Sequence, residues 1–538
     1  MRRLLITLVS AALVDAAPLH AQQLAEWRED LRVLATELPA RHKNAFTHIS
    51  RAQWDSAVRV LDAKLPRLQR HEIIVELMRL VALVRDGHTA LDLGEHVGFH
   101  RLPIQLYDFK NGLFVVAADS ADADLAGAKV VRIGSSSPED AMRAVGDLVS
   151  HESPNWVRAR APALLVVPEI LAALGMARDV HTAQLTLEQN GRRRVVTLTG
   201  TESMAGGHDQ SIAGQVEMSR ATTGADPLYL QHPGEPFWFT ILRDSTLYIG
   251  YRAVVFFANG MLNEQFFRRA FAAADSAGAV RVVLDMRDNG GGNNFLNRFV
   301  VKEIIRRPKL DRDDRCLVII GRRVFSAAQN LVNELDYYTN ATFVGEPTGN
   351  SPNQYGDARP LELPRSHLRV MVSSLLWQSH SASDEREWFP PDVYVEATSS
   401  DYAAKRDPVL ETALKHATGP TLADLLSRPA ARADTIELRR LVDAYRTDPQ
   451  NRYRDIEADI NVAGYRLIRG ADVEGAIAVF RINVALFPRS GNVYDSLGEA
   501  LERANRKDQA IAAYRRALSL NPNLGSSRDA LRRLGSTP

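Results

Sequence analysis

A serine at position 326 stands where the sequence pattern changes from strand to helix. Residues 316–335 read CLVIIGRRVFSAAQNLVNEL, in which an apolar run ends at Gly321 and a helix pattern begins at Ser326. A serine at the start of a helix commonly caps it by accepting a hydrogen bond from a backbone N–H group of the first turn. The same position suits a nucleophile, because the positive end of the helix dipole favours negative charge. This segment alone leaves both roles open.

Three consecutive glycines follow an earlier strand pattern in VVLDMRDNGGGNN, at Gly290, Gly291 and Gly292. They match neither the GxGxxG nor the GxxxxGK[ST] pattern of phosphate-binding loops. A flexible turn is one interpretation, and a turn that brings bare N–H groups to a developing oxyanion is another. Ala327 keeps the first turn after Ser326 small, so its N–H is open to a ligand. Two such turns on neighbouring strands would face each other at the carboxyl edge of an open α/β sheet.

The surrounding sequence supplies the strands and helices that this arrangement needs. Between about residues 228 and 395, strand patterns such as VRVVLDM and CLVIIG alternate with helix patterns such as LNEQFFRRAFAAADSAG. This alternation predicts parallel β-α-β units with helices covering the sheet. Upstream, residues 22–93 place apolar side chains at helical spacing, and short β-type runs dominate from about 99 to 200.

The C-terminal part of the chain repeats itself with a period of 34 residues. The aligned pairs are Ala476 with Ala510, Phe480 with Tyr514, Pro488 with Pro522, and Ala463-Gly464 with Leu497-Gly498. This is the period of the tetratricopeptide helix-turn-helix repeat. Stacked repeats of this kind form a concave surface that usually holds a peptide or a partner protein. A structural cap without a ligand is the alternative.

The composition is that of a globular chain with three or more domains. Of the 538 residues 45% are hydrophobic, and the net charge of +1 gives no indication of a nucleic-acid partner.

The first 21 residues combine two arginines, an apolar run and small residues, which predicts a secretory signal peptide cleaved after Ala21. The single cysteine, Cys316, excludes an intrachain disulfide and argues against thiol catalysis. We therefore expect an exported protein, periplasmic or secreted, without a membrane span.

Four segments carry a resemblance to a known family. They are VVLDMRDNGGGNN, VFSAAQNLVNEL, FVGEPTGNSPNQYGDA and WFPPDVYVE, and in this order and spacing they resemble the S41 peptidases. That family includes C-terminal processing proteases, the tricorn core and the modules of interphotoreceptor retinoid-binding protein. The likeness extends weakly upstream, through RDGHTALDL and a PDZ-like stretch over 104–146. It implies a ClpP/crotonase-like β-α-β core with Ser326 as nucleophile, and an oxyanion hole from the N–H groups of Ala327 and of Gly291 or Gly292.

The resemblance also narrows the choice of general base. Processing proteases of the family use a lysine in the loop after the GE-T-G motif, but here that loop reads TGNS, and the nearest lysines, Lys302 and Lys309, precede the serine. The tricorn-like branch uses a histidine from the N-terminal region, and RDGHT supplies His88 at the corresponding place. An imidazole titrates near neutrality and suits this task, although His88 could also simply end its helix beside Gly87. His380 is a fallback base.

By the same resemblance, the carboxylate that orients the histidine is expected within SASDEREWFPPD. Asp384 and Glu387 are the candidates, and a solvated charged turn is the alternative for each of them. Such a carboxylate would fix the imidazole tautomer and stabilise its cation. No pair of histidines has HExxH or other zinc-ligand spacing, so we expect neither a metal nor another cofactor.

We therefore expect an α/β chain of several domains (α+β multidomain) that acts as an exported serine-type peptidase, an endopeptidase or a C-terminal-processing enzyme, on peptide or protein substrates. The alternative is a catalytically inactive S41-fold module that binds an apolar ligand or a peptide, with protein interaction through the repeats. The missing lysine would be found in such a module too. The expected divisions are a signal peptide (1–21), a helical region (22–95), a PDZ-like β-rich domain (96–205), a catalytic α/β domain (206–410), a helical linker (411–455) and tetratricopeptide repeats (456–538).

Overall fold

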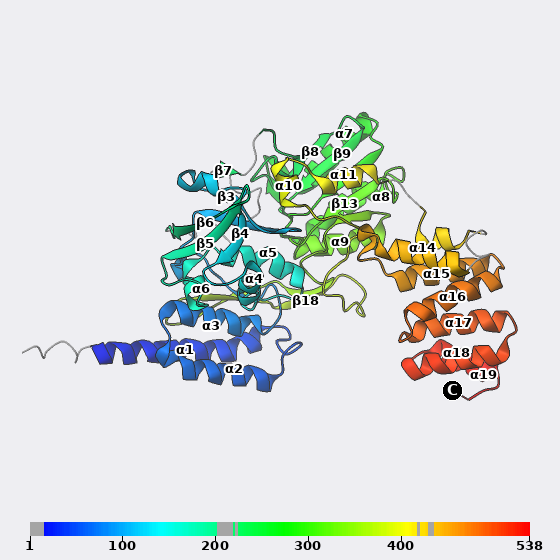
Figure 1. Cartoon of the computed structure of the whole chain (residues 1–538), viewed down its shortest axis with the longest axis horizontal. Helices are drawn as coiled ribbons and strands as arrows, with labels where there is room; N and C mark the ends of the chain where they lie inside the picture. The colour runs from blue at the N-terminus through cyan, green and yellow to red at the C-terminus, as the bar shows by residue number, and fades with distance from the viewer. Residues whose placement is uncertain (1–15, 202–218, 221–223, 417–419, 429–434, 538) are drawn as a thin grey trace, which may run out of the picture. The chain divides into compact units, whose positions relative to one another are not determined.

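The chain forms two compact units in a computed structural model that describes residues 16–201, 219–220, 224–416, 420–428 and 435–537 (Figure 1). The first unit comprises Met1–Ala341, Gly345–Phe389 and Glu396–Ala413, and the second comprises Thr342–Val344, Pro390–Val395 and Leu414–Pro538. Most of the predicted signal peptide, residues 1–15, lies outside the described residues, so cleavage after Ala21 stays a prediction. Among the described helices, none is both long enough and apolar enough to cross a membrane.

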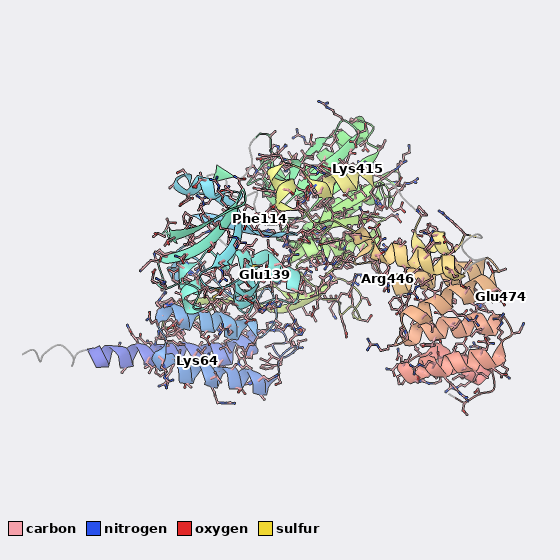
Figure 2. All side chains as sticks on the ribbon, viewed as in Figure 1. Lys64, Phe114, Glu139, Lys415, Arg446 and Glu474 are labelled. Carbon is pink, nitrogen blue, oxygen red and sulfur yellow. The ribbon has the colours of Figure 1, made fainter. Side chains whose placement is uncertain are left out.

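Three helices open the first unit: α1 (Ala16–Arg41), α2 (Arg51–Lys64) and α3 (Arg70–Ala82). Helix α3 carries apolar residues on most of its surface, and Ile74 and Leu77 are almost inaccessible to solvent. A helix with so wide an apolar face must lie inside the core, which explains its burial. An ion pair of 2.8 Å between Lys64 and Glu76 joins α2 to α3, and Lys64 is labelled in Figure 2.

An antiparallel sheet follows, with the strand order β2-β3-β4-β5-β6. Its strands are β2 (Ile104–Phe109), β3 (Gly112–Ala118), β4 (Lys129–Ile133), β5 (Thr182–Gln189) and β6 (Arg192–Thr199). Between β4 and β5 the chain forms α4 (Pro138–Gly146), α5 (Pro154–Leu164) and α6 (Pro168–Ala173). The β5–β6 hairpin turns at Asn190 and Gly191, both at positive φ, because this turn matches the twist of the strands.

The sheet that carries Ser326 contains four neighbouring strands of the first unit, in the order β13-β12-β9-β8. They are β8 (Phe237–Ile241), β9 (Thr246–Tyr251), β12 (Arg281–Asp285) and β13 (Cys316–Ile320), and the helices between and after them are α7 (Asn263–Ser276), α8 (Asn297–Ile305) and α9 (Ala327–Tyr338). Strand β12 runs parallel to both β9 and β13, and Asp285 pairs with Ile319. Strands β12 and β13 therefore end at the same edge of the sheet. The predicted α/β alternation is confirmed.

The second unit contains the helical repeats. Its consecutive helices are α14 (Thr435–Thr447), α15 (Ile456–Arg469), α16 (Val473–Leu486), α17 (Gly491–Arg503), α18 (Lys507–Leu520) and α19 (Gly525–Arg533). A Cβ atom added to Gly464 would lie 2.3 Å from the ring of Phe480, and one added to Gly498 would lie 2.8 Å from the ring of Tyr514. The same glycine–aromatic contact thus recurs after 34 residues, so the sequence period corresponds to a repeated packing contact. The mixed α/β class with a C-terminal helical repeat region is confirmed.

Candidate functional site

Ser326 lies at the N-terminus of α9, in a sharp turn after β13. Its backbone angles, φ 56° and ψ −127°, belong to a region that suits glycine and strains a residue with a Cβ atom. The residue occupies the cap position of the helix, but its side chain makes no capping hydrogen bond. The hydroxyl of this half-buried serine is therefore available at the positive end of the helix dipole.

The glycine turn lies directly against this serine. Gly291 has a φ of 101°, and a Cβ atom added to it would lie 2.6 Å from Cβ of Ser326 and 2.9 Å from the backbone nitrogen of Ala327. Gly292, with a φ of 137°, approaches Val254 so closely that a Cβ atom would lie 2.3 Å from that residue's carbonyl oxygen. The two turns are in contact at a point where only a bare backbone fits.

The backbone N–H groups around Ser326 differ in their availability. The N–H of Gly291 donates to Oδ1 of Asn289 at 2.9 Å, so this residue fixes the turn. Within the described part of the chain, the N–H groups of Gly292 and Ala327 have no acceptor. Of the predicted oxyanion donors, Gly292 and Ala327 therefore have an N–H group free for a developing negative charge.

Two amide side chains that the sequence analysis did not single out hold the strained backbone of Ser326. Oδ1 of Asn350 accepts the N–H of Ser326 at 2.9 Å, and Nε2 of Gln354 donates to its carbonyl oxygen at 2.9 Å. Both amides are almost fully buried, Asn350 at 0% and Gln354 at 1% exposure. Buried hydrogen bonds on both sides of one residue offset the cost of its unusual backbone angles.

His88 stands beside the residue that precedes the serine. Its ring packs on the ring of Phe325 with centroids 4.3 Å apart, and Trp156 stacks on Phe325 at 4.0 Å. Neither ring nitrogen of His88 hydrogen-bonds to any described residue, the serine included. Burial lowers the pKa of His88, and the opposing charges of Asp86 and Asp357 only partly offset this. The imidazole is therefore neutral at pH 7, the form that a general base requires.

Asp86 fixes the backbone that carries His88. The carboxylate accepts the N–H of His88 at 3.0 Å, and it also bonds to Nε2 of His42 at 2.9 Å and to the Thr89 hydroxyl. Burial by itself would raise the pKa of Asp86, but the bond from His42, the proximity of His88 and Ser373 and the bond from Thr89 together lower it. Asp86 therefore stays ionised within a fully bonded turn.

Glu152 is a second buried carboxyl group at this turn, and the sequence analysis missed it. Its Oε2 accepts the N–H of Gly87, the residue before His88, at 3.0 Å. Burial and the negative charge of Asp86 raise the pKa of Glu152 to about 8, while the side chain of Asn350 acts in the opposite direction. Glu152 thus lies between the turn that carries His88 and the amide that holds Ser326. As an isolated carboxylate within HESPNW, it gave no signal in the sequence.

The two predicted carboxylates have other partners. Glu387 is half-exposed and lies 3.5 Å from Arg85, whereas Asp384 pairs with Nδ1 of His380 at 2.8 Å and accepts hydrogen bonds from Arg386. Neither carboxylate hydrogen-bonds to His88, whose ring nitrogens are unpartnered within the described residues. A role for either in orienting the histidine stays a prediction.

Comparisons with known proteins give different answers for the two ends of the chain. A tetratricopeptide-repeat family model matches residues 491–524. A stretch of 104 residues, 19% of the chain, is 28% identical to the peroxisomal targeting signal receptor of Eremothecium gossypii (strain ATCC 10895 / CBS 109.51 / FGSC 9923 / NRRL Y-1056). That stretch spans 18% of the receptor, less than a fifth of the length of this curated relative.

Solved structures match a much larger part of the chain. Mature CPAF complexed with lactacystin has a TM-score of 0.52 at 12% identity, over 71% of this chain and 96% of that chain. A mutant of CPAF has a TM-score of 0.52 at 11% identity, over 74% and 99% of the two chains. The chain has the fold of CPAF. A putative S41 protease from Bacteroides fragilis also matches, at a TM-score of 0.31 and 15% identity over 61% and 85% of the two chains. The S41-type resemblance predicted from the motifs is confirmed as a likeness of fold.

Proposed function

We propose that this chain is a serine-type peptidase in which Ser326 is the nucleophile. The observation that carries the proposal is the strained turn at Ser326. Its hydroxyl has no hydrogen-bond partner among the described residues, while Asn350 and Gln354 bond its backbone. Strain of this kind persists where the surrounding structure enforces it, and it is concentrated at functional sites. The glycine turn in contact with Ser326 also contains Gly292, whose N–H has no acceptor among the described residues and is a donor of the kind that binds an oxyanion.

In the proposed reaction, neutral His88 takes the proton of the Ser326 hydroxyl as Oγ attacks the carbonyl carbon of the scissile peptide bond. The N–H groups of Gly292 and Ala327 bind the oxyanion of the tetrahedral intermediate. His88, now a cation, returns the proton to the leaving amine, and an acyl-enzyme remains. A water molecule then attacks the acyl carbon, with His88 again as base, and releases the acid product.

The proposed base must move to form a hydrogen bond with the nucleophile. His88 contacts Phe325, the neighbour of Ser326 in sequence, and its ring nitrogens are not engaged by any described residue that would hold them in place. Catalytic hydrogen bonds are often long or poorly aligned without substrate and tighten in the complex. A rotation of the imidazole on the face of Phe325 breaks no hydrogen bond of the ring, which supports His88 as the base.

A fluorophosphonate probe, which reacts with activated serines, tests this proposal. Wild-type protein should be labelled at Ser326, Ser326→Ala should not be labelled, and His88→Ala should be labelled at least about 100-fold more slowly, the loss typical of a missing general base. Ser276→Ala is the matched control, because this exposed serine on α7 hydrogen-bonds only to its own helix. Failure of the wild-type protein to react, or labelling of Ser326→Ala, would refute the assignment.

Export and a protein partner belong to the proposal as well. The amino-terminal residues, which predict a signal peptide, support export to the periplasm or out of the cell. The repeats, matched over 491–524, support binding of a protein or peptide partner by the second unit. Fractionation of cells that express the full chain, with the amino terminus of the mature protein determined, tests the export and the cleavage after Ala21.

A non-catalytic binding module is the second candidate, and one observation favours it. His88 makes no hydrogen bond to Ser326, and its imidazole packs on the ring of Phe325. Such a module would leave the probe unreacted and still bind a peptide or an apolar ligand. Saturable binding of unlabelled peptides, followed by intrinsic tryptophan fluorescence, together with no labelling by the probe would identify this candidate.

A further inference from the structure

A partly open, largely apolar cavity is lined in part by the proposed base. The cavity has a volume of about 390 Å³ within the first unit, and Gly87, His88 and Gly290 are among its lining residues. The volume falls within the range of small-ligand pockets, roughly 300–1,000 Å³. The cavity therefore begins between the proposed base and the glycine turn that contacts Ser326.

Much of the remaining lining consists of aliphatic side chains. Met78 and Val81 of α3, Leu148, Leu164 of α5 and Met371 come from segments far apart in the sequence and converge on the same space. Trp156 closes one side, and its ring stacks on Phe325, the residue before the nucleophile. A group inside the cavity would thus lie against aliphatic carbon and one aromatic face.

The charged residues of the lining are engaged with one another or with the wall. Asp288 and Arg323 form an ion pair of 3.5 Å, and the guanidinium of Arg160 lies over the ring of Trp156 at 5.4 Å. Asp92 accepts the N–H of Gly94 at 3.1 Å. A charged guest would have to compete with these contacts and lose its hydration, whereas an apolar guest exchanges only water for carbon surface.

We propose that this cavity receives a large apolar side chain, aliphatic or aromatic, of the peptide residue whose carbonyl is attacked by Ser326. The inference rests on the proposed function and specifies its substrate class. A side chain that enters between His88 and Gly290 carries its own backbone to the glycine turn and the serine. Burial of that side chain away from the reacting bond then positions the carbonyl for attack.

The test compares peptide amides that differ only at this residue, with leucine, phenylalanine, alanine or aspartate. For wild-type protein we expect kcat/KM for leucine or phenylalanine at least about tenfold above alanine and about 100-fold above aspartate, the selectivity that apolar pockets reach. Leu164→Trp, which fills the cavity, should reduce the leucine-to-alanine ratio at least fivefold. Leu164→Ala, which enlarges it, should raise the phenylalanine-to-leucine ratio several-fold. Val195→Trp, at an exposed position of β6, should keep the wild-type ratios.

Thermal unfolding shows whether each variant is folded. If Leu164→Trp does not fold, the result for Leu164→Ala decides the test. Two results would overturn the inference while the proposed peptidase activity stands. In the first, wild-type protein is labelled and active but does not prefer apolar residues in the substrate. In the second, it has that preference and both Leu164 variants retain it unchanged. Binding of the same peptides to Ser326→Ala tests whether the cavity binds an apolar side chain even if the protein is not a peptidase. If wild-type protein is unreactive but the leucine peptide still binds at least tenfold more tightly than the alanine peptide, the pocket stands and the peptidase fails.

Discussion

The two sides of the proposed site are built in opposite ways. The serine side, residues 289–292 and 325–327 with Asn350 and Gln354, has a strained backbone whose polar groups are held by uncharged amides. The histidine side, residues 86–89 with Glu152, has an ordinary helix-ending turn held by two buried carboxyl groups. Its ring nitrogens have no partner among the described residues. Preorganised geometry on one side thus faces a titrating and less constrained group on the other.

The largest expected effect comes from removal of the base. His88→Ala should lower kcat/KM by about 10²–10⁴-fold, the range for loss of a general base. It should also lower the free energy of unfolding by about 0.5–3 kcal/mol, because the ring loses its packing on Phe325. His380→Ala is the matched comparison, since that ring pairs with Asp384. Measurement of kcat/KM for both variants decides whether His88 or His380 is the base. A greater loss in His380→Ala would transfer the role of base to the fallback residue.

Gly291→Ala should break the serine side. The new methyl group would overlap Cβ of Ser326, and alanine would be strained at a φ of 101°, so the turn must move. We expect a loss of about 10²–10³-fold in the labelling rate, as for a disturbed oxyanion hole. Stability should fall by about 1–3 kcal/mol, measured by chemical denaturation. Gly290→Ala, where a Cβ atom meets nothing within 4 Å, should cost much less in both measurements, and equal losses would contradict the steric account.

Glu152→Gln should change how stability depends on pH. The pKa of Glu152 is raised to about 8 in the folded protein, so folding retains a proton that the unfolded chain loses above its ordinary pKa. The stabilisation is complete below pH 4.5 and disappears as the pH rises to 8, with a slope of up to about 1.4 kcal/mol per pH unit. Glutamine keeps the neutral shape and has no such slope. Denaturation of both proteins from pH 5 to pH 9 should give curves that diverge up to pH 8, and parallel curves would refute the shift.

The smallest effect concerns the pH profile of activity. Burial lowers the pKa of His88, so the base form persists below the ordinary value of 6.5. The acid limb of kcat/KM should therefore have its midpoint below pH 6.5, since kcat/KM reports ionisations of the free enzyme. A midpoint at or above 6.5 would mean that another group, or a more solvated histidine, acts as the base.

The sequence predicts the serine side well because its parts are local. Gly291 and Ser326 each follow a strand by a few residues, and parallel neighbours end at the same sheet edge, so their meeting follows from topology. The repeats could be predicted from the sequence equally well, since a fixed period places Gly464 and Gly498 against equivalent aromatic rings.

The histidine side depends on contacts that no local pattern encodes. Glu152 lies 64 residues beyond His88 in the chain and reaches it only through the packing of the first unit, as the bond to Gly87 shows. Asn350 and Gln354 lie inside a quoted motif, but their amides became recognisable only from the hydrogen bonds to Ser326. The aromatic stack of His88, Phe325 and Trp156 likewise joins three distant segments, which periodicity alone does not bring together.

The backbone conformation of Ser326 implies that the reactivity of this residue is retained at the expense of protein stability. At a φ of 56° and a ψ of −127°, glycine would fit without the steric penalty that serine incurs. The exchange Ser326→Gly should therefore raise the melting temperature while removing the hydroxyl, and a protein selected for durability alone would not keep a serine here. The residue marks a place where the molecule is less stable than it could be, which is the cost expected of a site retained for its reactivity.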